Sequence, residues 1–323
     1  MGPLSVVGMS AHEITGAGVK TEAGPEARAS RPGPGGAAAR VAIAIAVMLL
    51  STTVPTLIMA IPGVEALLDG KVFGRGNTGL LLVCLAALAI MSLATACAFL
   101  CARILITRLD HARPADLAMR PSPRALAWCV GMIITAFLVV SGTGLLGDLL
   151  GVARVEPAVP GDTWWSAILI QIALGFFLQG IPEELVWRGW LFRSLGSTRT
   201  AAAVSVLVFT VMHLASQGGQ EGWGERFIYL AMPFGFGAAA MAARWVSGST
   251  WAAVGAHGGF HLSNLLAVGI GVPVDEPVTW VVIGCLWLVA GAIVLLLHKT
   301  RAGRANAAVG ACTQTTGRVT SKR

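Results

Sequence analysis

Long apolar segments alternate with short polar ones along most of the chain. Mainly apolar windows of the length that a bilayer core requires, about 20 residues per helix, occur eight times. They lie near residues 41–61, 79–106, 125–146, 163–187, 200–215, 227–246, 250–270 and 278–298. The fifth is short, which suits a helix shielded by its neighbours rather than one that faces lipid. The pattern predicts an all-α fold, a polytopic membrane helix bundle with about eight transmembrane helices.

Composition supports this prediction. Hydrophobic residues make up 55% of the 323 residues and charged residues only 12%, whereas soluble globular proteins carry roughly 25% charged residues. A surface so poor in charge excludes an ordinary water-soluble enzyme. The membrane lipid is therefore the first partner that we expect.

The pattern also divides the chain into three parts. Residues 1–40 are rich in Gly, Pro, Ala and Ser and hold no apolar stretch long enough to pack, so we expect a disordered cytoplasmic tail. Residues 41–298 form the predicted transmembrane domain. Residues 299–323 are basic and are predicted to be a second cytoplasmic tail.

Orientation follows from the loops, because cytoplasmic loops collect Lys and Arg. An even number of spans puts both termini on one side, and most Lys and Arg residues fall on that side. The opposite loops hold only Lys71, Arg75, Arg154 and Arg226. We therefore expect both termini in the cytoplasm and the protein in the plasma membrane. Orientation also accounts for the net charge of +7, so we expect no nucleic-acid partner. Abundant Ala and Gly, with more Arg than Lys, indicate a GC-rich bacterial genome.

Ionisable side chains inside the spans are the candidates for chemistry, because each costs roughly 2.5–3.5 kcal/mol to insert at the helix centre. Few such residues occur. They are Glu183, Glu184, Arg188, His213, His257 and His261. By the predicted topology, they lie toward the cytoplasmic half of the bilayer.

Helical spacing indicates how the acidic pair is used. Glu184 and Arg188 are four residues apart, on one helix face, and can neutralise each other. Glu183 is rotated about 100° from Glu184, so it can point into a cavity. Two carboxylates in unlike environments are a common way to make one of them a general base. Pro182 removes a helical hydrogen bond just before them.

The histidines lie on two further spans. His257 and His261 are also four apart, and Asn264 keeps the same helical face. His213 follows Phe209 by four residues on the short fifth span. These three spans together offer enough polar groups for one site within the membrane.

These residues resemble the CAAX protease and bacteriocin-processing family of intramembrane peptidases, which includes the type II CAAX prenyl endopeptidases. The family signature is E-E-x-x-x-R, then F-x-x-x-H, then H-x-x-x-N or H-x-x-x-D, each on a separate membrane helix. The motif region of this chain, residues 182–264, contains Glu183-Glu184-xxx-Arg188, Phe209-xxx-His213 and His257-xxx-His261 in that order. The last position departs from the pattern, since His261 replaces Asn or Asp and Asn264 follows one turn later.

The resemblance implies an endopeptidase with a cytoplasm-facing site. It implies that Glu183 activates a water molecule, that Glu184 and Arg188 support it, and that the histidines position the water or bind the oxyanion. The substrate would be a membrane peptide or a lipidated protein, and the sequence does not show whether it is prenylated.

Other interpretations stay open. Glu183, His213 and His257 could instead ligate a zinc ion, with water as the fourth ligand, and the sequence does not separate the two mechanisms. A non-catalytic immunity or scaffold protein could use the same cavity, and a His pair could hold haem or a metal. Oligomeric state cannot be read from the sequence.

Overall fold

The computed structural model describes residues 32–69, 72–74, 76–158 and 161–320, with side chains as far as residue 300. Every regular element in this part of the chain is helical, which confirms the predicted all-α fold. The long helices are α1 (Pro34–Met59), α3 (Asn77–Ile104), α4 (Pro123–Leu149), α10 (Ala231–Ser247), α11 (Thr250–Gly269) and α12 (Pro277–Thr320). Shorter ones are α2 (Glu65–Leu68), η1 (Leu105–Leu109), η2 (Pro114–Leu117), α8 (Arg199–Met212), η5 (His213–Ala215) and α9 (Trp223–Tyr229).

The predicted fourth span is a composite helix. It runs from Trp164 to Ser194 and consists of α5 (Trp164–Ile172), η3 (Ala173–Gly180), α6 (Ile181–Glu184), η4 (Leu185–Leu191) and α7 (Phe192–Ser194). The segments η3 and η4 are π-helices on either side of α6. Pro182, which has no N–H to donate, lies in the first turn of α6. The helix therefore continues past the proline with wider turns, a distortion that is frequent at functional sites.

Six of the described helices are long and apolar enough to cross a membrane, which is fewer than the eight predicted. They begin at Pro34, Asn77, Pro123, Trp164, Trp223 and Pro277. The predicted fifth span corresponds to the shorter apolar helix Arg199–Ala215. The predicted seventh span corresponds to α11, whose histidines and glycines lower its hydropathy. Both of these helices carry site residues.

The outer surface of the bundle is apolar, as a lipid-facing surface requires. Leucines such as Leu126, Leu138 and Leu145 are about two-thirds exposed, at 65%, 66% and 68%. An apolar surface of this extent would make a protein aggregate in water. The chain is therefore a multi-pass membrane protein.

The two predicted tails overlap helices. Helix α1 begins at Pro34, so the boundary predicted at residue 40 lies inside it. Proline is favoured in the first helical turn, and the alanines that follow it are the best helix formers. Residues 1–31 lie outside the described residues. At the other end α12 extends to Thr320, through most of the predicted tail 299–323.

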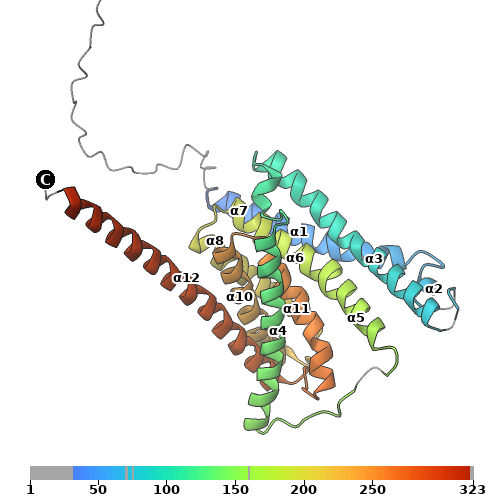
Figure 1. Cartoon of the computed structure of the whole chain (residues 1–323). Helices are drawn as coiled ribbons and strands as arrows, with labels where there is room; N and C mark the ends of the chain where they lie inside the picture. The colour runs from blue at the N-terminus through green and yellow to red at the C-terminus, as the bar shows by residue number, and fades with distance from the viewer. Residues whose placement is uncertain (1–31, 70–71, 75, 159–160, 321–323) are drawn as a thin grey trace, which may run out of the picture. The chain divides into compact units, whose positions relative to one another are not determined.

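Helix α11 lies inside the bundle and packs against α4, α10 and η3, as Figure 1 shows for α4, α5 and α10 around it. A tight turn fixes its start. Gly248 ends α10 with φ of 71°, a left-handed conformation that favours glycine. Ser249 then caps α11 by accepting a hydrogen bond from the Trp251 N–H. His257 is therefore held two turns into a helix whose start is fixed.

Glycines allow α10 and α12 to touch along their backbones. A Cβ at Gly235 would overlap the backbone of Gly284, and one at Gly284 would overlap the Ala231 carbonyl. We expect Gly284→Ala to lower the free energy of unfolding by about 1–3 kcal/mol, because the backbones must separate. Gly131→Ala on α4 is the control, since no atom lies within 4 Å of the added Cβ. Thermal unfolding in detergent measures both variants, and equal melting temperatures would contradict the close packing.

Candidate functional site

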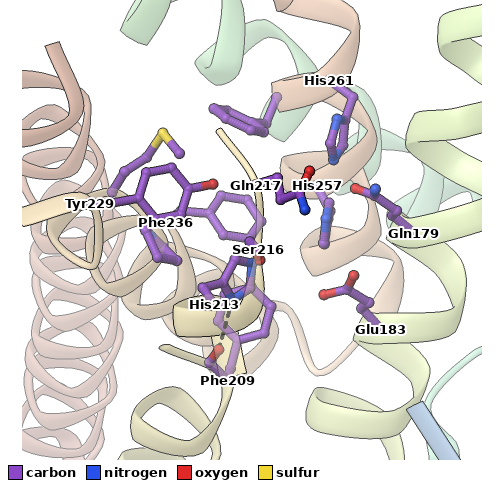
Figure 2. Close-up of a pocket in the computed structure, with 13 residues that line it drawn as sticks. Gln179, Glu183, Phe209, His213, Ser216, Gln217, Tyr229, Phe236, His257 and His261 are labelled. Atoms are coloured by element: carbon purple, nitrogen blue, oxygen red, sulfur yellow. Dashed lines mark hydrogen bonds between the residues drawn. The ribbon is translucent and has the colours of Figure 1, made fainter. Parts of the chain in front are cut away.

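A cavity of about 310 Å³ lies where the composite helix, η5, α10 and α11 meet. Five of the predicted residues line it (Figure 2): Glu183, Phe209, His213, His257 and His261. Glu184 and Arg188 lie behind its wall and are fully buried. Asn264 is half-buried on α11 and does not line the cavity. The structure therefore brings together the three predicted motifs from three separate parts of the chain.

The two adjacent carboxylates have different environments. Glu184 is completely buried, and its Oε1 accepts a hydrogen bond of 3.2 Å from Arg188 Nη1, the pair that the four-residue spacing predicts. Glu183 is half-buried and points into the cavity (Figure 2). One carboxylate is thus held by a cation within the protein. The other is accessible to a substrate or a water molecule.

Glu184 also accepts a hydrogen bond from His257, a contact between residues 73 positions apart that the sequence did not indicate. The distance from His257 Nδ1 to Glu184 Oε1 is 2.9 Å. Because a carboxylate has no proton to give, Nδ1 is the donor. The other ring nitrogen, Nε2, is then left for the cavity. It is an acceptor in the neutral ring and a donor in the imidazolium.

Arg188 is held from several directions. Its Nη2 donates to the Gly237 carbonyl at 3.2 Å, and its guanidinium lies 4.2 Å from the centroid of the Phe209 ring. The phenylalanine of the F-x-x-x-H motif thus packs on the arginine of the first motif. A cation over an aromatic face is stabilised by the ring quadrupole. These contacts fix the cation beside Glu184.

His213 is oriented by its own helix. Its Nδ1 donates to the Phe209 carbonyl at 2.7 Å, because a carbonyl oxygen can only accept. In the neutral ring Nε2 therefore carries the lone pair and can accept a proton from a water molecule. Glu183 lines the same cavity as this ring.

His261 stacks on His257 one turn further along α11. The ring centroids are 5.3 Å apart and the planes are within 15° of parallel. Gly175 on η3 makes room for His261, since a Cβ at Gly175 would lie 2.5 Å from the His261 Cβ. The position that is Asn or Asp in the resembling family thus places an imidazole at the cavity wall.

Several polar residues of the cavity wall were not predicted. They are Gln179, Ser216, Gln217 and Tyr229. Gln179 precedes Glu183 by four residues, so helical spacing could have indicated it. Tyr229 is the only tyrosine of the chain, and its hydroxyl points into the cavity (Figure 2). Ser216 and Gln217 follow η5 in a loop, where no periodic pattern applies.

The side chains do not form a ready metal site. Among the described residues, no three His, Cys, Asp or Glu side chains are arranged to hold a metal ion. In the predicted ligand set, His257 Nδ1 donates to Glu184 and His213 Nδ1 donates to the Phe209 carbonyl. Nε2 of both rings is left for the cavity, as is usual in histidines that ligate a metal. Glu183, His213 and His257 all line the same cavity. The chemistry below is accordingly derived from the protein groups alone.

Comparison with known proteins agrees with the geometry. The family model described as Type II CAAX prenyl endopeptidase Rce1-like matches residues 164–263, from the start of the composite helix to α11. No curated protein and no solved structure matches the chain. The matched segment contains each residue that lines the cavity. Residues 164–263 are thus similar to the type II CAAX prenyl endopeptidase Rce1-like family.

Proposed function

We propose that this protein is an intramembrane endopeptidase in which Glu183 activates the attacking water. The observation that carries the proposal is the difference in environment between the adjacent carboxylates of Glu183 and Glu184. Glu184 is buried and bonded to Arg188 and His257, whereas Glu183 faces a cavity that the histidines share. A general base must reach the proton that it removes, and only Glu183 of the pair is placed to do so.

The reaction begins with a water molecule between Glu183 and His213. Glu183 accepts one proton as the water oxygen attacks the peptide carbonyl carbon, and the neutral Nε2 of His213 accepts a hydrogen bond from the remaining O–H. The bond to the Phe209 carbonyl keeps this ring in the required tautomer. His213 is thus assigned to orienting the water.

His257 is assigned to stabilising the negative charge that develops on the peptide carbonyl oxygen. The carboxylate of Glu184 stabilises the His257 imidazolium, whose Nε2–H donates to the oxyanion of the tetrahedral intermediate. A donor placed in advance where charge develops is worth about 10²–10³-fold in rate. When the C–N bond breaks, the leaving nitrogen takes the proton from Glu183. The immediate products are a carboxylic acid and an amine, and transfer of the acid proton to the amine leaves a carboxylate and an ammonium group.

Charge balance supports these roles. Two carboxylates and one guanidinium leave the group Glu183, Glu184 and Arg188 at minus one when the histidines are neutral. One further proton makes the cluster neutral, and in the proposed mechanism that proton is the one on the His257 imidazolium. A neutral cluster is favoured inside a membrane, where isolated charge is expensive.

The substrate that we propose is a membrane-inserted peptide or a lipidated protein. The family description names CAAX prenyl endopeptidases, which supports testing a prenylated C-terminal peptide first. The surplus of Lys and Arg on one side supports a plasma-membrane protein with cytoplasmic termini.

The test is peptide cleavage by the full chain reconstituted in vesicles. Two quenched fluorescent peptides of one sequence are compared, one farnesylated on its C-terminal cysteine and one unmodified, each with and without a zinc chelator. We expect cleavage that the chelator leaves unchanged. Cleavage that is lost with chelator and restored by zinc would replace the glutamate mechanism by a metal one. Failure to cleave either peptide, or a panel of membrane-inserted peptides, would overturn the endopeptidase proposal.

A further inference from the structure

A second cavity, a groove of about 730 Å³, lies between α8, α10 and α12. It shares no lining residue with the candidate site. Exposed apolar side chains border it, among them Leu207 at 54%, Phe234 at 38% and Leu295 at 40% exposure. The groove is therefore open to the lipid side of the bundle and separate from the proposed peptidase chemistry.

Small residues make the groove deep. Ala202 and Ala203 on α8 face Ala238 and Ala242 on α10 across it, and a methyl side chain leaves space between two helices that a leucine would fill. On α10 the lining residues extend from Phe234 to Trp245. At 1.5 Å per residue this wall is roughly 17 Å long. That length accommodates most of one fatty acyl chain.

One end of the groove is basic. Arg199 comes from the first turn of α8, and His298 and Lys299 come from α12. Helix α12 runs in the same direction as α10, because Gly284 meets Ala231 and Gly291 meets Ala239. The α12 residues near 298 therefore lie level with the end of α10 that carries Trp245. Within the described part of the chain, none of the three basic side chains forms an ion pair with a carboxylate.

We propose that this groove binds an anionic phospholipid. One acyl chain lies along the alanines, and the phosphate lies between Arg199 and Lys299, with His298 as a further donor. Basic pockets at the ends of transmembrane helices are suited to acidic lipid headgroups. The phosphate would also meet the free N–H groups at the start of α8, where the helix dipole favours an anion. Charge complementarity thus selects the headgroup, and the apolar groove takes the chain.

Two other occupants fit the groove less well. A zwitterionic lipid adds no net negative charge, so it leaves the cations of Arg199 and Lys299 uncompensated. If the prenyl group of a substrate lay in this groove, the attached peptide would also lie here. The groove has no lining residue in common with the Glu183 cavity, where the peptide must bind to be cleaved. Neither a zwitterionic lipid nor a prenyl group would both neutralise the basic end and fill the apolar part of the groove.

The experiment is native mass spectrometry of the full chain in detergent, titrated with phosphatidylglycerol or phosphatidylcholine of equal chain length. We expect preferential retention of phosphatidylglycerol. Arg199→Ala/Lys299→Ala should weaken its binding by about 10- to 30-fold, since each basic residue near an anionic headgroup contributes on the order of 1 kcal/mol. The control is Arg120→Ala/Arg124→Ala, which removes two exposed charges that do not line the groove and should leave binding unchanged.

A steric variant tests the groove itself. Ala203 is exposed, so Ala203→Trp should fill the groove without disturbing the interior and should abolish phosphatidylglycerol retention. Val211→Trp is the matched control on the same helix, at a residue that is 56% exposed and outside the groove. Equal retention of both lipids would overturn the proposal. Unchanged binding in the Ala203→Trp or the charge variant, or displacement of the lipid by a farnesylated peptide, would also overturn it. None of these outcomes depends on peptide hydrolysis.

Discussion

Replacing Glu183 by glutamine is expected to lower the rate of peptide cleavage by about 10²–10⁴-fold, the range typical of general-base removal. Glutamine has almost the same shape but cannot accept the proton of the attacking water. Glu183 is half-buried beside the cavity and makes no ion pair in the described structure. The variant should therefore retain the wild-type melting temperature. Cleavage of the reconstituted substrate and thermal unfolding are measured on the same preparation.

The matched control for this variant is Asp162→Asn, which makes the same chemical change at an exposed residue remote from the cavity lining. It should keep full activity. Wild-type turnover in Glu183→Gln would refute the assigned role of Glu183. If Glu183→Gln loses turnover yet still complements a deletion strain, the biological role is that of a non-catalytic scaffold or immunity protein, as the same cavity would permit.

Local spacing predicted the part of the site that lies on one helix. Glu184 and Arg188 are neighbours in any helix because they are four residues apart, and the structure contains their ion pair. The same argument separated Glu183 from Glu184. It could not supply the bond between Glu184 and His257, which depends on how η3 and α6 pack against α11. That packing requires glycine at Gly175, where a Cβ would lie 2.5 Å from the His261 Cβ on α11.

The remaining differences have similar causes. Asn264 shares a helical face with His261 by spacing, but the cavity ends before it. Tyr229 ends the short helix α9, and only the fold shows that this helix end meets the cavity. Length and hydropathy identify six of the eight predicted spans among the described residues, because α8 is short and α11 is polar inside the bundle. The polar residues that a site requires lower the hydropathy of the helix that carries them, so hydropathy alone misses such a helix.

Removing Arg188 is expected to have the largest effect on stability. Arg188→Ala leaves the Glu184 carboxylate fully buried without its cation, and breaking a buried pair in this way costs about 3–5 kcal/mol. Arg193→Ala on the same composite helix is the control. Arg193 is partly exposed and lies 3.7 Å from Asp116, so its loss should cost no more than about 1 kcal/mol. Denaturant or thermal unfolding in detergent compares them.

Replacing both Glu184 and Arg188 by neutral residues should restore most of the stability lost in Arg188→Ala but should not restore peptide cleavage. In Glu184→Gln/Arg188→Met both fully buried charges of the pair are removed, and the glutamine carbonyl can still accept from His257 Nδ1. We expect the double variant to recover to within about 1–2 kcal/mol of the wild type, because an apolar replacement of a buried pair is close to neutral. Its cleavage rate should nevertheless stay about 10²-fold low, because the His257 imidazolium has lost its counter-charge. A double variant as unstable as Arg188→Ala would show that Arg188 acts through its contacts with Gly237 and Phe209 rather than through Glu184.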